Sequence, residues 1–64
     1  MKYSIYFTWN DGTEDSFDAI DAKDRDLNIK EMIERKEFKR ISYSKKYANG
    51  EIGRGIVCYW NGER

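Results

Sequence analysis

The sequence predicts a small α+β domain of order ββαββ, with one helix packed on one face of a four-stranded antiparallel sheet. Three observations carry this prediction. Residues 3–9 alternate in the manner of a half-buried strand, two turns rich in Asn and Gly separate strand-like segments, and a central segment has helical spacing. The 64 residues form one domain, 1–64, near the lower size at which a chain folds unaided.

The first predicted hairpin has the clearest pattern. One face of its first strand carries large apolar side chains: Tyr3, Ile5, Phe7 and Trp9. The other face carries Ser4, Tyr6 and Thr8. The turn Asn10-Asp11-Gly12 follows, because these residue types tolerate the positive φ that tight hairpin turns require. The return strand, 13–20, is rich in acids and is therefore predicted to be a charged edge strand that discourages sheet association.

The helix is predicted over about 28–38. Asn28 is the expected N-cap and Glu31 the residue that reaches back to it, as in a capping box. The apolar stripe is narrow: Ile29, Met32 and Ile33. The preceding stretch, 21–27, is polar and ambiguous and stays unassigned.

The second hairpin is predicted from a third strand that alternates over Ile41, Tyr43, Lys45 and Tyr47. The turn 48–51 contains Asn-Gly, and a fourth strand runs over about 52–60. Gly53 and Gly55 within it indicate a bulge, a bend or a close backbone approach. Two alternatives stay open for the residues that point away from the helix: Val57 with Tyr59, or Ile56 with Cys58 and Trp60.

Composition restricts the class of protein and its compartment. One cysteine and no histidine leave no intramolecular disulfide and no structural zinc site, and they suit a reducing cytoplasm. No apolar run approaches the roughly 20 residues of a membrane span, and the N-terminus has no apolar signal region. We therefore expect a cytoplasmic protein with no membrane partner. Efficient packing or self-association, such as a homodimer, must supply the remaining stability.

Charge is balanced overall but unevenly distributed. Residues 1–26 hold seven acids and three bases, whereas residues 27–64 hold nine bases and five acids. The net charge of zero therefore conceals a segregation that becomes two surface patches only if folding keeps the halves apart.

No catalytic apparatus is recognisable. Histidine, the commonest general base, is absent, and Cys58 lies in the most apolar segment, where a thiol packs as a small hydrophobe. Asp24, Asp26 and Asn28 have the spacing that opens a calcium loop, but the sixth and twelfth positions are Ile29 and Arg35 instead of Gly and Glu. We expect no enzyme activity, no cofactor and no metal.

The best functional clue is the aromatic content. Two Trp, five Tyr and three Phe exceed what one short helix can cover, so we expect some rings to meet another molecule. The predicted partner-binding anchors are Tyr6, Trp9, Tyr43, Tyr59 and Trp60, and the predicted basic rim is Lys45, Lys46 and Arg54. The alternative is that the rings only border a small core.

Two other ligands remain open. Rings on a sheet beside a basic rim could stack single-stranded nucleic acid, although the RNA-binding sheet signature is absent and the net charge is neutral. The acidic hairpin, residues 11–26, could instead compete for a basic, nucleic-acid-binding surface on a protein.

Three segments carry a resemblance to other proteins: 1–7, with Met-Lys-Tyr-Ser-Ile-Tyr-Phe; 9–15, with Trp-Asn-Asp-Gly-Thr-Glu-Asp; and 23–31, with Lys-Asp-Arg-Asp-Leu-Asn-Ile-Lys-Glu. In composition and in the wording of the hairpin turn, these segments resemble small proteins encoded by phages and prophages of low-GC Gram-positive bacteria. The resemblance implies a non-enzymatic protein that binds and blocks a host protein, including an anti-phage defence protein, and that acts as a homodimer in many cases. It assigns no site residues, since no functional motif accompanies it.

Overall fold

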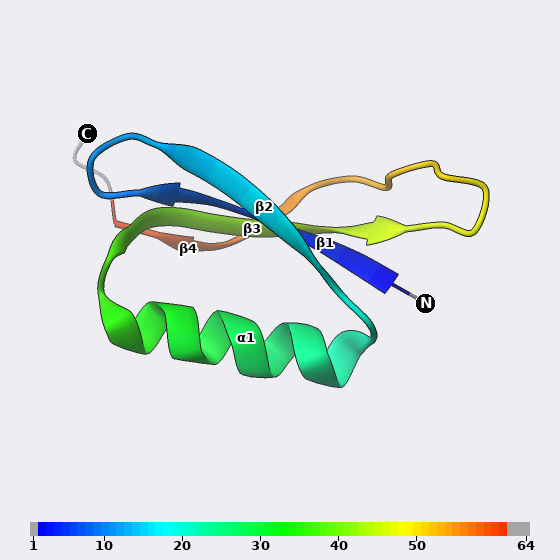
Figure 1. Ribbon diagram of the computed structural model, residues 1–64, viewed down its shortest axis with the longest axis horizontal. Helices are drawn as coiled ribbons and strands as arrows, with labels where there is room; N and C mark the ends of the chain where they lie inside the picture. The colour runs from blue at the N-terminus through cyan, green and yellow to red at the C-terminus, as the bar shows by residue number, and fades with distance from the viewer. Residues whose placement is uncertain (1, 62–64) are drawn as a thin grey trace.

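A computed structural model describes residues 2–61 and confirms the predicted α+β fold of order ββαββ. Its elements are β1 (Lys2–Trp9), β2 (Glu14–Ala19), α1 (Ala22–Arg35), β3 (Phe38–Lys46) and β4 (Ile56–Trp60). The strands form one antiparallel sheet in the order β2-β1-β3-β4, and α1 lies across one of its faces (Figure 1). No helix in residues 2–61 is long and apolar enough to cross a membrane.

The core lies between α1 and the two central strands. Ile5 and Ile41, both fully buried, stand on the helix side of β1 and β3, where their burial contributes roughly 1.5–3 kcal/mol each. The other buried apolar residues are Ala19, Ile29, Met32 and Phe38. The face predicted for the rings of β1 is the one that packs toward this core, since Tyr3, Phe7 and Trp9 all border it.

The helix begins earlier than predicted, and Asn28 is not its cap. Asp21 is the N-cap: it has extended backbone, and its carboxylate accepts a hydrogen bond from the Asp24 N–H at 2.8 Å. Asn28 lies inside the helix and donates to the Asp24 carbonyl at 2.7 Å. Residues 21–27 show no apolar stripe in the sequence because most of this first part of the helix is exposed. It adds no apolar side chain to the core.

The helix also ends earlier, at Arg35, because Lys36 adopts the left-handed conformation (φ 56°) and its N–H donates to the Ile33 carbonyl. Phe38, which was predicted to end the helix, instead opens β3 and is buried in the core. Its pairing with Trp9 of β1 accounts for the change, since a helix continuing to residue 38 would remove this ring from the sheet.

The fourth strand is shorter than predicted. Only an isolated bridge between Lys46 and Ile52 precedes it, and regular pairing begins at Ile56. A bulge leaves Cys58 without a partner on β3, so neither predicted alternation of β4 is right. Val57 is opposite Ser42 and Trp60 is opposite Arg40, which places both on the face away from α1. Ile56 and Tyr59 pair with the helix-side residues Tyr43 and Ile41.

The N-cap assignment gives a stability prediction. Asp21→Ala should lower the free energy of unfolding by about 1 kcal/mol, because the N–H of Asp24 loses its acceptor. Asn28→Ala is the matched control and should cost less, because Ala is a better helix former at an interior position. Urea denaturation of the two variants measures the difference. A larger loss for Asn28→Ala would mean that the helix begins where the sequence pattern placed it.

Candidate functional site

Three of the predicted anchors pack against the core on the helix side of the sheet: Trp9, Tyr43 and Tyr59. Trp9 lies 4.6 Å from Phe38 and 5.5 Å from Phe7 between ring centroids, within the range of favourable aromatic pairs. Trp9, Phe7 and Phe38 close the end of the core near the C-terminus of α1. Most of their surface is therefore already used within the protein.

Tyr43 has a second role, which the sequence pattern did not indicate. The Arg25 guanidinium carbon lies 4.4 Å from the Tyr43 ring centroid and 4.5 Å from that of Tyr3, so the cation rests on both rings. Although burial acts to lower the pKa of Arg25, the hydrogen bond and charge of Asp26 raise it overall. No spacing rule could have found this site, because α1 brings Arg25 to two strands that are distant in the sequence.

The open face of the sheet carries the other two ring anchors, Tyr6 and Trp60. Tyr6, Ser42 and Val57 stand opposite one another across β1, β3 and β4, and Trp60 is opposite Arg40 in the neighbouring row. Tyr6 is 36% exposed, Val57 49% and Trp60 53%. We call this group, with Arg40 and Ser42, the open-face patch.

Small hydroxyl residues form the floor of the open face. Ser4, Ser42 and Ser44 are buried although no helix within residues 2–61 covers this face. A hollow of about 240 Å³ beside Tyr6 extends to Arg40 and Ser42, with Glu14 on its far side. The patch is thus an uneven surface with projecting rings and a polar floor.

Lys46, one of the predicted rim cations, is engaged within the protein. Its Nζ lies 2.8 Å from the Asp18 carboxylate, which also accepts a hydrogen bond from the Ser4 hydroxyl at 3.1 Å. The hydrogen bond from Lys46 is the main cause that lowers the pKa of Asp18, and the same contact raises the pKa of Lys46. This pair joins β3 to β2 across the face and neutralises both charges.

Lys45 and Arg54, the other two rim cations, belong to the opposite side of the sheet. Lys45 pairs with Tyr3, a helix-side residue. Arg54 lines a hollow of about 250 Å³ together with Lys45, Arg25 and Tyr43. The structure therefore brings Tyr6 and Trp60 to one face and assembles Tyr43, Lys45 and Arg54 on the other.

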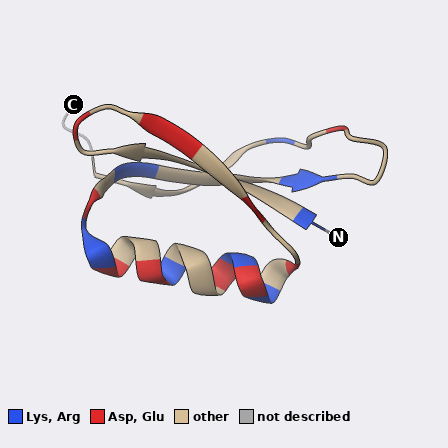
Figure 2. Ribbon diagram, in the orientation of Figure 1, with Lys and Arg blue, Asp and Glu red and all other residues tan. Residues whose placement is uncertain are grey.

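The charge segregation of the sequence is only partly retained in space. Figure 2 shows acids on β2, bases on β3 and both signs mixed along α1. Because β1 lies between β2 and β3, the acidic edge and the basic strand are separated by one strand only. The Asp18–Lys46 pair bridges that gap, so the two halves do not form isolated patches.

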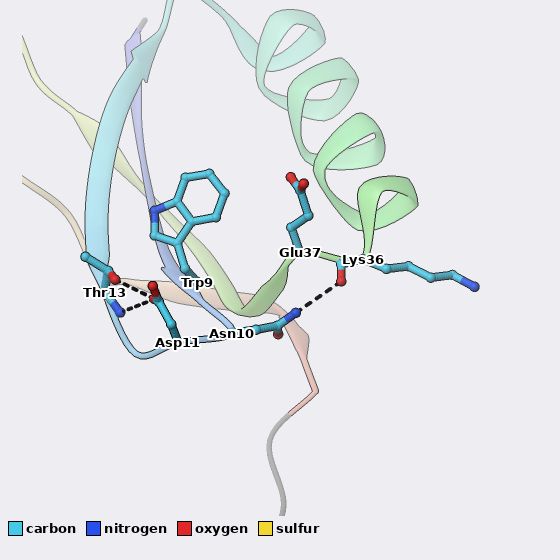
Figure 3. A pocket seen from close by; sticks show the side chains of 6 residues that line it. All are labelled: Trp9, Asn10, Asp11, Thr13, Lys36 and Glu37. Carbon is cyan, nitrogen blue, oxygen red and sulfur yellow. Dashed lines mark hydrogen bonds between the residues drawn. The ribbon is translucent and has the colours of Figure 1, made fainter.

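A further hollow, of about 430 Å³, lies where the β1–β2 turn meets the end of α1 (Figure 3). Its polar groups are used to build the turn. Asn10 Nδ2 donates to the Lys36 carbonyl at 3.2 Å, and Asp11 Oδ1 accepts from the Thr13 hydroxyl and from the Thr13 N–H at 2.9 Å. These bonds from Thr13, that of the hydroxyl first, lower the pKa of Asp11. The hollow is thus a product of the turn and not a set of groups aimed at a ligand.

Neither the candidate nucleophile, Cys58, nor the residues with the spacing of a calcium loop lies in a reactive or metal-binding arrangement within residues 2–61. Burial raises the pKa of the Cys58 thiol, whose Sγ lies 3.2 Å from the Ile41 carbonyl, so the thiol stays protonated at neutral pH. Asp24, Asp26 and Asn28 lie within α1 and not in a loop. Within residues 2–61, no three His, Cys, Asp or Glu side chains are grouped closely enough to hold a metal ion.

The two tryptophans should differ in their effect on stability. Trp9→Ala should lower the free energy of unfolding by about 2 kcal/mol or more, because it leaves Phe7 and Phe38 without a packing partner. Trp60→Ala should change it by less than about 0.5 kcal/mol, as for other exposed positions. Denaturation followed by circular dichroism measures both. Equal losses would contradict the division of the rings between core and open face.

The Asp18–Lys46 pair should be visible in a pH titration. Because folding lowers the pKa of Asp18, its carboxylate favours the folded state above the ordinary value of 3.8, and this contribution is lost as pH falls through the lowered value. Lys46→Gln should move the Asp18 pKa back toward 3.8, measured by NMR of the side-chain carboxyl carbon. Lys45→Gln removes the same charge from the other face and should leave it unchanged. An identical Asp18 pKa in the two variants would refute the assignment.

In comparisons with known proteins, no family model, curated protein or solved structure matches this chain. The resemblance to phage-encoded proteins therefore stays a prediction.

Proposed function

We propose that this chain is a non-enzymatic binding protein that acts by covering a surface of a partner protein. The observation that carries the proposal is the open-face patch, where Tyr6 of β1 and Val57 and Trp60 of β4 project on either side of β3, above a floor of serines. Following the resemblance in sequence style, the partner we propose is a host protein, such as an anti-phage defence protein, which the chain would inhibit by occlusion.

The chemistry of the patch suits a protein partner. Trp, Tyr and Arg are the residue types that most often dominate the binding energy of protein interfaces, and Trp60, Tyr6 and Arg40 occur together here. Tyr and Trp present a large apolar area with little side-chain entropy to lose on binding. The buried serine between Tyr6 and Val57 keeps the centre of the patch polar.

The open face of the sheet is small. In Figure 1 α1 lies below the sheet along the intermediate axis, so this face extends along the longest and shortest axes of the domain, 36 and 16 Å between Cα atoms. A standard interface buries about 800 Å² on each partner. A partner that makes a contact of this size at the open-face patch would therefore cover most of this side of the sheet.

Single-stranded nucleic acid is the less favoured ligand for this face. Stacking platforms combine aromatic side chains with a positive groove along the same surface. Here Lys45 and Arg54 are on the helix side, and Lys46 is neutralised by Asp18. Glu14 also lines the hollow beside Tyr6, where it would repel phosphates.

The proposal is tested by comparing variants in a capture experiment. Immobilised wild-type protein is exposed to a lysate of a low-GC Gram-positive bacterium in parallel with Trp60→Ala and with Leu27→Ala. Leu27 is an ideal control, because it is 53% exposed like Trp60 but lies on α1. We expect a host protein that Trp60→Ala captures at least tenfold less and that Leu27→Ala captures normally, a difference of about 1.4 kcal/mol or more.

Three outcomes would count against the proposal. Capture that does not depend on Trp60, or that is lost equally in the Leu27 variant, would remove the open-face patch as the binding surface. Binding of labelled oligonucleotides that weakens steeply with salt and requires Trp60 would favour the nucleic-acid function instead. Light scattering that shows a dimer abolished by Trp60→Ala would identify the partner as a second copy of the chain.

A further inference from the structure

A second candidate site lies on the opposite side of the sheet, beneath the hairpin that joins β3 to β4. In Figure 1 this hairpin projects past the body of the domain. The hollow of about 250 Å³ at its base is lined by three cations, two tyrosines and two apolar residues: Arg25, Lys45, Arg54, Tyr43, Tyr47, Gly53 and Ile56. The cations come from α1, β3 and the hairpin, so only the folded chain brings them together.

The hollow has an excess of positive charge. No carboxylate lines it among residues 2–61. Arg25 has an ion pair with Asp26 at 2.8 Å, but Lys45 and Arg54 have no ion pair within the described part of the chain. Like charges gathered at one site repel each other, and an anion placed between them converts that repulsion into attraction.

The surrounding structure restrains the Arg25 side chain and the backbone that carries Lys45 and Arg54. The Arg25 side chain is only 17% exposed and rests between the rings of Tyr3 and Tyr43. The Gly53 N–H donates to the Lys45 carbonyl at 2.9 Å, which holds the segment before Arg54 against β3. This restraint lowers the conformational entropy that a ligand would have to remove.

Tyr47 completes one wall of the hollow. A Cβ on Gly53 would lie 3.5 Å from Tyr47 Cε2, so the ring packs directly on the glycine backbone. The ring is 42% exposed and therefore keeps free surface beside Lys45. An aromatic ring next to unpaired cations is the combination that binds a phosphate together with a planar group attached to it.

We propose that this hollow binds the phosphate group of a small molecule. Arg54 offers a planar fork of N–H donors suited to phosphate oxygens, and Lys45 adds a compact charge. The volume is below the roughly 300–1,000 Å³ typical of drug-sized sites, so it favours one phosphate with a small attached group. The source is either inorganic phosphate or a nucleoside monophosphate, whose base would lie on Tyr47.

Amide NMR titrations with inorganic phosphate and, separately, with uridine monophosphate test this site on the intact protein. We expect saturable shifts of the Lys45, Gly53 and Arg54 amides with a Kd of about 1 mM or tighter. Lys45→Gln and Arg54→Gln should each weaken binding at least fivefold. Lys30→Gln removes one positive charge from α1, outside the hollow, and should leave the affinity unchanged.

The two arms distinguish the sources, and the result is independent of the proposed function. Tighter binding of the nucleotide that is lost in Tyr47→Ala identifies the nucleotide, whereas equal binding of both ligands identifies phosphate alone. No saturable shift with either ligand, or equal weakening in the Lys30 and Lys45 variants, would overturn the assignment. Trp60→Ala leaves this hollow intact, so the open-face patch can fail while phosphate binding holds, and the reverse.

Discussion

A single helix of 14 residues covers one face of a four-stranded sheet, and the rest of the structure depends on this limited coverage. α1 contributes only Ile29 and Met32 as buried residues, so the sheet supplies the rest of the core, and its helix-side rings pack around that core. The period of two along β1 and β3 delivers those rings to one side. Every residue of opposite parity is then left on a face that no further element within residues 2–61 covers.

The polarity of that open face depends on small residues as much as on large ones. Serines on the two central strands keep its floor polar, while Tyr6, Val57 and Trp60 project above it. If all these positions were large and apolar, the face would be an aggregation hazard. A few exposed anchors among hydroxyl groups are instead compatible with a free state that binds only a complementary surface. On the helix side the three cations differ in their surroundings. Arg25 packs on the rings of Tyr3 and Tyr43, whereas Lys45 and Arg54 have no ion pair within residues 2–61.

The two edges of the sheet are protected in different ways. β2 carries Glu14, Asp15 and Asp18, which oppose the addition of another strand. β4 has no charged side chain, but it is only five residues long and is interrupted by the bulge at Cys58. A bulge alters the twist and the hydrogen-bonding pattern of an edge, so this strand is a poor template for regular pairing. The same bulge sends both Val57 and Trp60 to the open face, which links protection of the edge to the composition of the open-face patch.

The sequence alone determined the fold class, the β1–β2 hairpin, the helix-side rings of β1 and the charged edge strand, because alternation and Asn/Gly turns are local signals. It did not locate the start of α1, since Asp21 and Asn28 are both good caps and the residues between them add no apolar side chain to the core. Nor could it divide the predicted anchors Tyr6, Trp9, Tyr43, Tyr59 and Trp60 between core and surface. One unpaired residue in β4 shifts its alternation, and α1 brings Arg25 to rings distant in the chain. Tertiary structure alone decided these features, because they depend on contacts between segments that no local pattern records.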